Sequence, residues 1–195
     1  MTAHGPEHSH WYVQRFRQMA ADGADLAGEA RLVDALVPVR SRLLDAGCGP
    51  GRVGAELHAR GHTVVGVDID PVLIGAAVED HPGPTCLVAD LATLDISGDD
   101  DYQPFDGAVV AGNVMPYLAP GTGAQGLTAI GRHLRADAPI AVGFGLDRGY
   151  TLDAFDSDVQ LAGLRLENRF ATWDLHAWTP HSPFAVTVLR TPTAG

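Results

Sequence analysis

The 195-residue sequence is poor in cysteine, in basic side chains and in long apolar runs. Its two cysteines, Cys48 and Cys86, do not form a CxxC pair, so we expect no disulfide framework and a reducing, cytoplasmic location. No apolar run approaches the ~20 residues that a membrane span needs, and residues 1–10 lack the basic and apolar regions of a signal peptide. We therefore predict no membrane partner.

Basic residues are outnumbered, with 13 Lys and Arg against 24 Asp and Glu, for a formal net charge of -11. A surface of that sign repels phosphate backbones, and no basic cluster offsets it, so no nucleic-acid partner is expected. The densest acidic segment, residues 95–101, is interpreted as a solvated loop. The length and the 46% hydrophobic content suit one globular domain, and nothing in the sequence indicates an oligomeric state.

What the chain does contain is a regular alternation of short apolar segments and helical patterns. The predicted strands cover residues 42–46, 63–67, 85–88, 105–111 and 138–144, and the predicted helices between and after them cover residues 53–60, 71–79, 126–134 and 152–161. Single helices between apolar strands indicate a mostly parallel sheet with helices on both faces, which is a doubly wound α/β fold. Two last strands, residues 164–170 and 184–189, have no helix between them and must pair antiparallel or lie apart.

A glycine-rich turn follows the first predicted strand, in the segment DAGCGPG at residues 45–51. In doubly wound sheets ligands bind beyond the carboxyl ends of the strands. Glycines let the backbone turn sharply and approach a ligand, and the following helix presents unpaired N–H groups. We therefore predict that Gly47, Gly49 and Gly51 form a cofactor site.

The charge of Asp45 discriminates between two cofactors. Residues 49–54 satisfy the dinucleotide pattern GxGxxG, and Asp68 at the end of the second strand can hold the ribose of NAD or of S-adenosylmethionine. Asp45 would repel a diphosphate by about 3 kcal/mol per charge pair at ~5 Å and an effective dielectric of ~20. It would attract the ammonium and sulfonium of S-adenosylmethionine. Asp90, after the third strand, is placed to accept a hydrogen bond from an adenine amino group.

Several segments carry a family resemblance, and together they span most of the chain from about residue 42 to residue 189. They are LLDAGCGPG at residues 43–51, VGVDID at 65–70, ADL at 89–91, FDGAVVA at 105–111 and LRADA at 134–138. In this order and spacing they resemble the class I S-adenosylmethionine-dependent methyltransferases of the small-molecule type. The resemblance implies a Rossmann-like sheet of seven strands whose last strand is antiparallel, and transfer of a methyl group to an acceptor.

The resemblance also implies roles for individual residues. Asp45 and the glycines would face the methionine portion of the cofactor, Asp68 the ribose, and Asn113 with Val114 would close over the donor. In related enzymes an aromatic residue or an arginine of the entry helix caps the cofactor carboxylate, a role we assign to Tyr12 and Arg17. The predicted cofactor-binding residues are Tyr12, Arg17, Asp45, Gly47, Gly49, Gly51, Asp68, Ile69, Ala89, Asp90, Leu91, Asn113 and Val114.

The N-terminal part is predicted to cap this site. Residues 1–10 show no hydrophobic pattern and are expected to be mobile, whereas residues 11–19 and 26–37 are predicted helices. We divide the chain into an N-terminal helical segment, residues 1–41, that covers the cofactor, and a cofactor-binding methyltransferase domain, residues 42–195.

The acceptor is less well defined by the sequence. The segment NVMP at residues 113–116 does not match the Asn-Pro-Pro-aromatic motif of enzymes that methylate base or glutamine amino groups, and no His, Asp and Glu constellation indicates a metal. We expect a small-molecule acceptor in a pocket formed by residues 113–118, 145–151 and 173–181. No catalytic residue is assigned, because alignment accounts for most of the rate of methyl transfer. For the four candidates in these segments, Tyr117, Tyr150, His176 and His181, a packing or surface role is favoured.

Three alternatives remain open on the sequence alone. An NAD-dependent oxidoreductase would use the same glycine turn. A protein that binds S-adenosylmethionine without catalysis would keep every motif named above. A methyltransferase acting on protein or RNA is disfavoured by the acidic charge balance.

Overall fold

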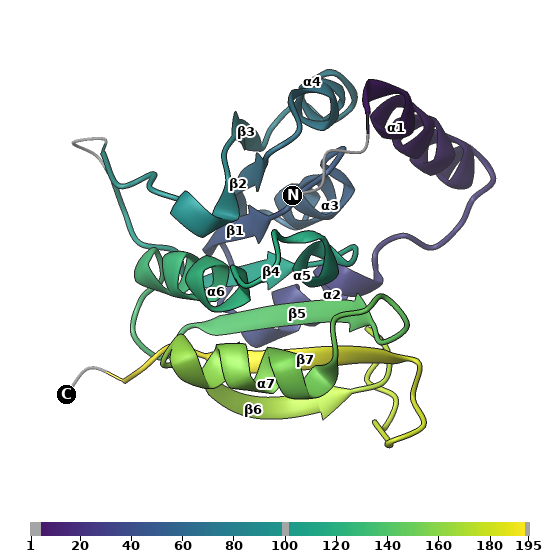
Figure 1. Cartoon of the computed structure of the whole chain (residues 1–195). Helices are drawn as coiled ribbons and strands as arrows, with labels where there is room; N and C mark the ends of the chain where they lie inside the picture. The colour runs from purple at the N-terminus through teal and green to yellow at the C-terminus, as the bar shows by residue number, and fades with distance from the viewer. Residues whose placement is uncertain (1–4, 99–101, 194–195) are drawn as a thin grey trace.

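The computed structural model describes residues 5–98 and 102–193, which form a seven-stranded sheet in the order β3-β2-β1-β4-β5-β7-β6 (Figure 1). The strands are β1 Arg42–Ala46, β2 Thr63–Asp68, β3 Thr85–Val88, β4 Gly107–Val110, β5 Pro139–Gly145, β6 Arg165–Phe170 and β7 Phe184–Arg190. β7 runs antiparallel to both of its neighbours, and the other paired strands are parallel. The predicted fold class and the antiparallel last strand are therefore confirmed.

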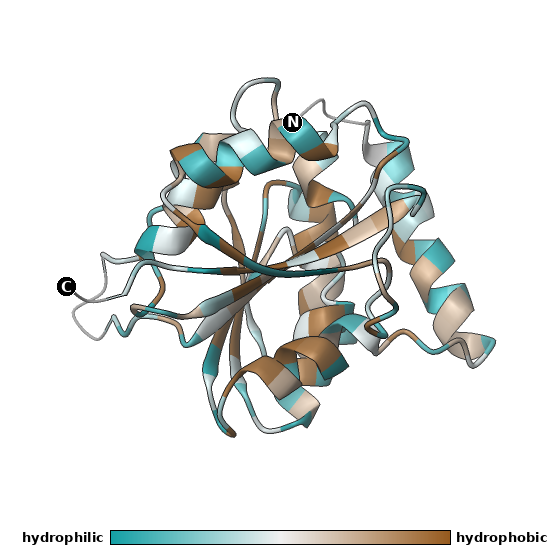
Figure 2. Cartoon of the chain, turned by 90° about the horizontal axis from the view of Figure 1, so that it is seen from below, coloured by the Kyte–Doolittle hydropathy of each residue, from teal (hydrophilic) through white to brown (hydrophobic). Residues whose placement is uncertain are grey.

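Helices cover both faces of the sheet and bury it (Figure 1). One face carries α2 Gly28–Leu36, α3 Arg52–Ala59 and α4 Pro71–Asp80, and the other carries the 3-10 turn η1 Leu91–Thr93 with α5 Val114–Tyr117, α6 Gly123–Arg132 and α7 Leu152–Leu161. β1 and β5 lie inside the sheet, and nearly all of their side chains are buried. The hydropathy colouring follows this arrangement, with apolar residues on the strands and on the helix sides that face them (Figure 2).

The first helix, α1 Pro6–Ala21, lies outside these layers and packs against α4 (Figure 1). It begins earlier than the predicted residue 11, with Pro6 in its first turn, where a missing N–H costs nothing. Ser9 is buried and its hydroxyl donates a hydrogen bond to the Asp70 carboxylate. The prediction that the first helix begins at residue 11 is therefore wrong. Residues 1–4, part of the segment expected to be mobile, lie outside the described residues.

Most element boundaries agree with the prediction within two residues, and the exceptions have local causes. α6 begins three residues earlier than predicted, after Thr122. η1 and α5 span only three and four residues, too few to show a helical period. Among the described residues, no helix is both long enough and apolar enough to cross a bilayer.

Candidate functional site

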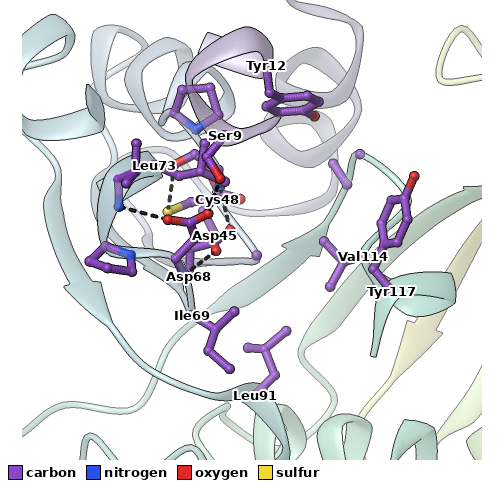
Figure 3. A pocket seen from close by; sticks show the side chains of 18 of the residues that line it. Ser9, Tyr12, Asp45, Cys48, Asp68, Ile69, Leu73, Leu91, Val114 and Tyr117 are labelled. Atoms are coloured by element: carbon purple, nitrogen blue, oxygen red, sulfur yellow. Dashed lines mark hydrogen bonds between the residues drawn. The ribbon is translucent and has the colours of Figure 1, made fainter. Parts of the chain in front are cut away.

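A cavity of about 450 Å³ opens at the carboxyl ends of β1, β2 and β4, beneath α1 (Figure 3). β1 and β4 are neighbours, but the chain leaves them toward opposite faces of the sheet, which makes this the topological switch point where ligands bind in such folds. Its volume lies within the range of about 300–1,000 Å³ that is usual for small-molecule sites. The lining includes the predicted residues Tyr12, Asp45, Gly47, Gly49, Asp68, Ile69, Ala89, Asp90, Leu91 and Val114.

The three glycines of the turn all have positive φ, but each leaves space for a different neighbour. A Cβ on Gly47 would collide with Val114, and one on Gly51 would lie 2.8 Å from the Ala77 Cβ on α4. Gly51 is absent from the cavity lining, and its role is to let α4 approach. A Cβ on Gly49 would meet only the Tyr12 ring, at 3.7 Å, on the cavity side. Gly47 and Gly49 therefore border the cavity, whereas Gly51 supports it.

Asp68 joins the end of β2 to the glycine turn. Its two carboxylate oxygens accept hydrogen bonds from the Gly49 N–H at 2.9 Å and the Asp70 N–H at 3.0 Å. The residue is 7% exposed, and burial raises the pKa of its carboxyl. Each oxygen has further acceptor capacity, so the same carboxylate can hold the turn and accept hydroxyl donors from a ligand.

Asp45 is the most buried acid of the site. It is 1% exposed, and it accepts a hydrogen bond from the Gly54 N–H at 2.9 Å. Burial raises the pKa of Asp45 to about 7, and the nearby Arg52 guanidinium opposes that rise only in part. A cation beside Asp45 would favour its charged form.

The side of the cavity below Asp68 is apolar. Ile69, just after β2, and Leu91, at the start of η1, point into it (Figure 3). Asp90 accepts a hydrogen bond from the Ala92 N–H at 2.9 Å and so caps η1, while it also lines the cavity. Asp90 thus caps η1 and also lies at the cavity, as the sequence predicted.

The roof of the cavity comes from one face of α1. Ser9, Tyr12 and Phe16 recur at helical spacing and all line the cavity, and burial raises the pKa of Tyr12. Arg17 points away from this face, forms ion pairs with Asp80 and Glu79 on α4, and is not among the lining residues. The structure therefore does not bring Arg17 to the cavity.

A different arginine, Arg52 at the start of α3, lines the cavity. Its guanidinium donates to both oxygens of Glu29 and to the Leu26 carbonyl oxygen, and it lies 5.2 Å from the centre of the Phe16 ring. The sequence analysis missed Arg52, although its position directly after the glycine turn was a usable signal. It also missed Ser9 and Phe16, which depend on the placement of α1.

The predicted acceptor segments are only partly brought together. Val114, Tyr117 and Leu118 line the main cavity, with Tyr117 at its edge opposite Tyr12 (Figure 3). Asn113 instead accepts a hydrogen bond from the Gly145 N–H at 2.7 Å and borders a separate hollow that residues 145–148 also line. Its φ of 66° turns the chain into α5. Asn113 therefore positions Val114 rather than lining the cavity itself.

The prediction that residues 173–181 line the pocket is wrong. The Trp173 ring lies over Gly143 of β5, where a Cβ would collide with it, and packs in the core beneath α2. Trp178 lies beside Arg169 of β6, and His176 and His181 are exposed. Tyr150 donates a hydrogen bond to Asp158 of α7 and packs on Phe144. Among the described residues, no group of three or more His, Cys, Asp or Glu could hold a metal ion.

The fold and the cavity define an α/β protein with a nucleotide-type cofactor site at its switch point, and comparison with known proteins specifies its family. A family model described as a methyltransferase domain matches residues 43–137. The crystal structure of a TehB-like S-adenosylmethionine-dependent methyltransferase from Corynebacterium glutamicum is 43% identical, with a TM-score of 0.89 over 96% of this chain and 100% of that one. The chain belongs to the class I S-adenosylmethionine-dependent methyltransferases, which use S-adenosylmethionine as methyl donor.

Two further relatives are more distant. Magnesium-protoporphyrin O-methyltransferase of Rhodobacter capsulatus is 34% identical over 123 residues, which are 62% of this chain and 53% of that protein. The chain thus spans about half the length of that curated relative. The CcbJ methyltransferase of Streptomyces caelestis is 18% identical, with a TM-score of 0.74 over 85% of this chain and 89% of its own, which shows the shared fold. Family membership sets the oxidoreductase alternative aside.

Proposed function

We propose that this protein transfers the methyl group of S-adenosylmethionine to a small-molecule acceptor, with the donor bound in the cavity beneath α1. The observation that carries the proposal is the convergence of two buried carboxyl groups, Asp45 and Asp68, on a glycine turn whose Gly49 faces the cavity with only the Tyr12 ring nearby. When bound, the donor supplies a methyl group already activated on a sulfonium. The protein itself has to bind the donor, orient it and shield it.

The residues that line the cavity fit the parts of that donor. Asp68 would accept hydrogen bonds from the ribose hydroxyls, because its oxygens have capacity beyond the Gly49 and Asp70 N–H groups. Ile69, Ala89 and Leu91 would pack on the adenine, with Asp90 at its polar edge.

The charged end of the donor would lie near the glycine turn. Asp45 would attract the ammonium, and Gly47 and Gly49 would let the backbone approach. Tyr12 and Arg52 are the groups of the cavity that fit the carboxylate, whereas Arg17 is held by Asp80 on the outer surface. Val114 would close over the donor from α5, positioned by Asn113.

The acceptor would enter between α1 and α5. The lining there consists of Phe16, Val114, Tyr117 and Leu118, which is largely apolar and has Tyr12 opposite. A confined apolar space favours a compact acceptor, because rate depends on alignment of the nucleophile with the donor methyl. The substrate in the name of the Rhodobacter capsulatus relative is itself a small molecule, and the net charge of -11 disfavours nucleic acid.

The segment that caps the donor would then be shorter than the expected N-terminal segment, residues 1–41. α1 would cap the donor, through Ser9, Tyr12 and Phe16. α2 packs in the core against β4 and β5 and belongs with the sheet. The functional cap is therefore α1 alone.

Transfer assays on the full chain test this proposal. Methyl-labelled S-adenosylmethionine is incubated with pools of small molecules grouped by accepting atom (oxygen, nitrogen, sulfur or carbon), and products are identified by mass spectrometry. We expect S-adenosylhomocysteine and one methylated pool, with little transfer by Asp68→Asn. Label appearing in RNA or protein instead would contradict the acceptor class. Tight donor binding with no transfer across all pools would favour the non-catalytic alternative.

A further inference from the structure

The two cysteines of the chain lie together beside the glycine turn. Cys48 is buried in the turn and lines the cavity, while Cys86 in β3 is partly exposed. Gly66 of β2 lies next to both cysteines and pairs in register with Cys86. A Cβ on Gly66 would lie 3.0 Å from the Cys48 Sγ and 3.5 Å from the Cys86 Sγ. The missing side chain therefore leaves one space into which both sulfur atoms converge.

The two thiols differ in reactivity. The interaction between the neighbouring thiols lowers the pKa of Cys86 and raises the pKa of Cys48, which burial raises further. The thiolate is the nucleophilic form of cysteine, so Cys86 is the thiol that reacts first. It is also the one that solvent reaches, whereas Cys48 is placed behind it as a resolving partner.

We propose that Cys48 and Cys86 form an oxidation site, at which a hydroperoxide converts the pair into a disulfide that weakens binding of the methyl donor. The Cys86 sulfur attacks a peroxide oxygen, the O–O bond breaks, and Cys86 becomes a sulfenic acid as water leaves. The Cys48 sulfur then attacks the Cys86 sulfur and expels a second water. The two thiols together lose two protons and two electrons, and one hydrogen peroxide becomes two waters.

The consequence for the cavity follows from the position of Cys48, and this step rests on the proposed function. A disulfide holds its sulfur atoms at about 2.05 Å, much closer than two thiols that are not covalently bonded. Cys48 stands between Gly47 and Gly49, and the Gly49 N–H is bonded to Asp68. A disulfide that draws Cys48 toward β3 therefore displaces the glycine turn relative to Asp68, the carboxylate that would hold the ribose. By thermodynamic linkage, a bound donor would oppose the disulfide by the same factor.

Intact-mass and peptide mapping test the chemistry without reference to the donor. The reduced full chain is treated with hydrogen peroxide, and we expect the loss of two hydrogens per chain and a Cys48–Cys86 linked peptide, reversed by dithiothreitol. Cys86→Ser lies outside the cavity lining and is the matched control, which should gain no such link. Oxygen addition without a link, or a covalent dimer through Cys86, overturns the proposal.

Calorimetry with S-adenosylhomocysteine then tests the coupling. Oxidation should weaken binding roughly 5- to 150-fold in the wild type, dithiothreitol should restore it, and peroxide should leave the affinity of Cys86→Ser unchanged. Equal affinity of the linked and reduced forms contradicts the coupling. If the reduced chain itself ignores S-adenosylhomocysteine, the proposed function fails, whereas the mass result still decides whether the oxidation site exists.

Discussion

At the scale of single residues, the protonation state of Asp45 determines how strongly the site attracts a cation. The sequence argument treats Asp45 as a charged group, but in the fold it is 1% exposed and burial raises its pKa to about 7. The attraction for an ammonium therefore depends on removing a proton. Because one proton is displaced, binding is linked to pH.

We predict that the affinity for S-adenosylhomocysteine falls by up to about tenfold per pH unit below pH ~7 and levels off above it. Calorimetry between pH ~5.5 and ~8 measures this. Asp45→Asn should bind more weakly and with a flatter pH profile. His8 also lines the cavity, so His8→Ala is measured as a control, and the pH dependence that persists in this variant is assigned to Asp45. A flat profile in the wild type would show that Asp45 does not contact the ammonium.

In the protein without ligand, the charged form of the Asp45 carboxyl should lower the free energy of unfolding. Its pKa is higher in the folded state than in the unfolded state, so its favourable contribution is present at acid pH and is lost as the pH rises through about 7. At pH ~8, Asp45→Asn should therefore raise the free energy of unfolding, on the order of 2 kcal/mol. Urea denaturation measures it. The gain should shrink as the pH falls toward about 4, and a loss of stability at pH ~8 would contradict the sign.

At the scale of elements, α1 is fastened to α4 at two points. Ser9 bonds Asp70 near the N-terminal end of α1, and Arg17 pairs with Asp80 near its other end. Arg52, which faces the cavity from α3, instead forms an ion pair with Glu29. The two arginines therefore make different predictions for donor binding.

Arg17→Ala should lower the affinity for S-adenosylhomocysteine by less than about fivefold, because an exposed ion pair contributes about 0–1 kcal/mol. Arg52→Gln should lower it by more than about tenfold, since it removes the cation that lines the cavity. Glu29→Gln controls for the broken ion pair, and thermal melts report folding. A larger loss for Arg17→Ala would restore Arg17 as the residue that caps the carboxylate.

The approach of α4 to the glycine turn requires Gly51. Its φ is 85°, and a Cβ would lie 2.8 Å from the Ala77 Cβ. Gly61 has a φ of 96° with open space around its Cβ position, so it carries the backbone cost alone. We expect Gly61→Ala to lower the free energy of unfolding by about 1–2 kcal/mol and Gly51→Ala by about 2–5 kcal/mol. Denaturant titration measures both, and equal losses would mean that the packing contact is unimportant.

At the scale of the whole molecule, the sequence predicted the features that depend on local pattern. The doubly wound fold class could be inferred because apolar strands alternate with single helices, and Asp45, Asp68 and the glycines lie at strand ends that a parallel sheet must bring together. The sequence did not predict contacts that depend on where α1 lies. The sequence assigned Arg17 to the site because it lies on the predicted entry helix, and only the packing of α1 against α4 shows that it points away from the cavity.

The same limit explains the segment near Trp173. Aromatic residues in a connector are typical both of a binding pocket and of a sealed core. Here Trp173 fills the space above Gly143, a pairing between residues thirty positions apart that no local pattern indicates. The cavity beneath α1 is bordered instead by residues of α1 and α5, among them Tyr12 and Tyr117 (Figure 3).

The central claim is that the cavity beneath α1 binds a cationic thioether nucleoside and not a dinucleotide. Calorimetric titration of the full chain at pH ~8 with S-adenosylhomocysteine and, separately, with NADH tests this directly. We predict one-to-one binding of S-adenosylhomocysteine that Asp68→Asn weakens by about 10- to 100-fold, and no binding of NADH. Binding of NADH with indifference to S-adenosylhomocysteine would contradict the account.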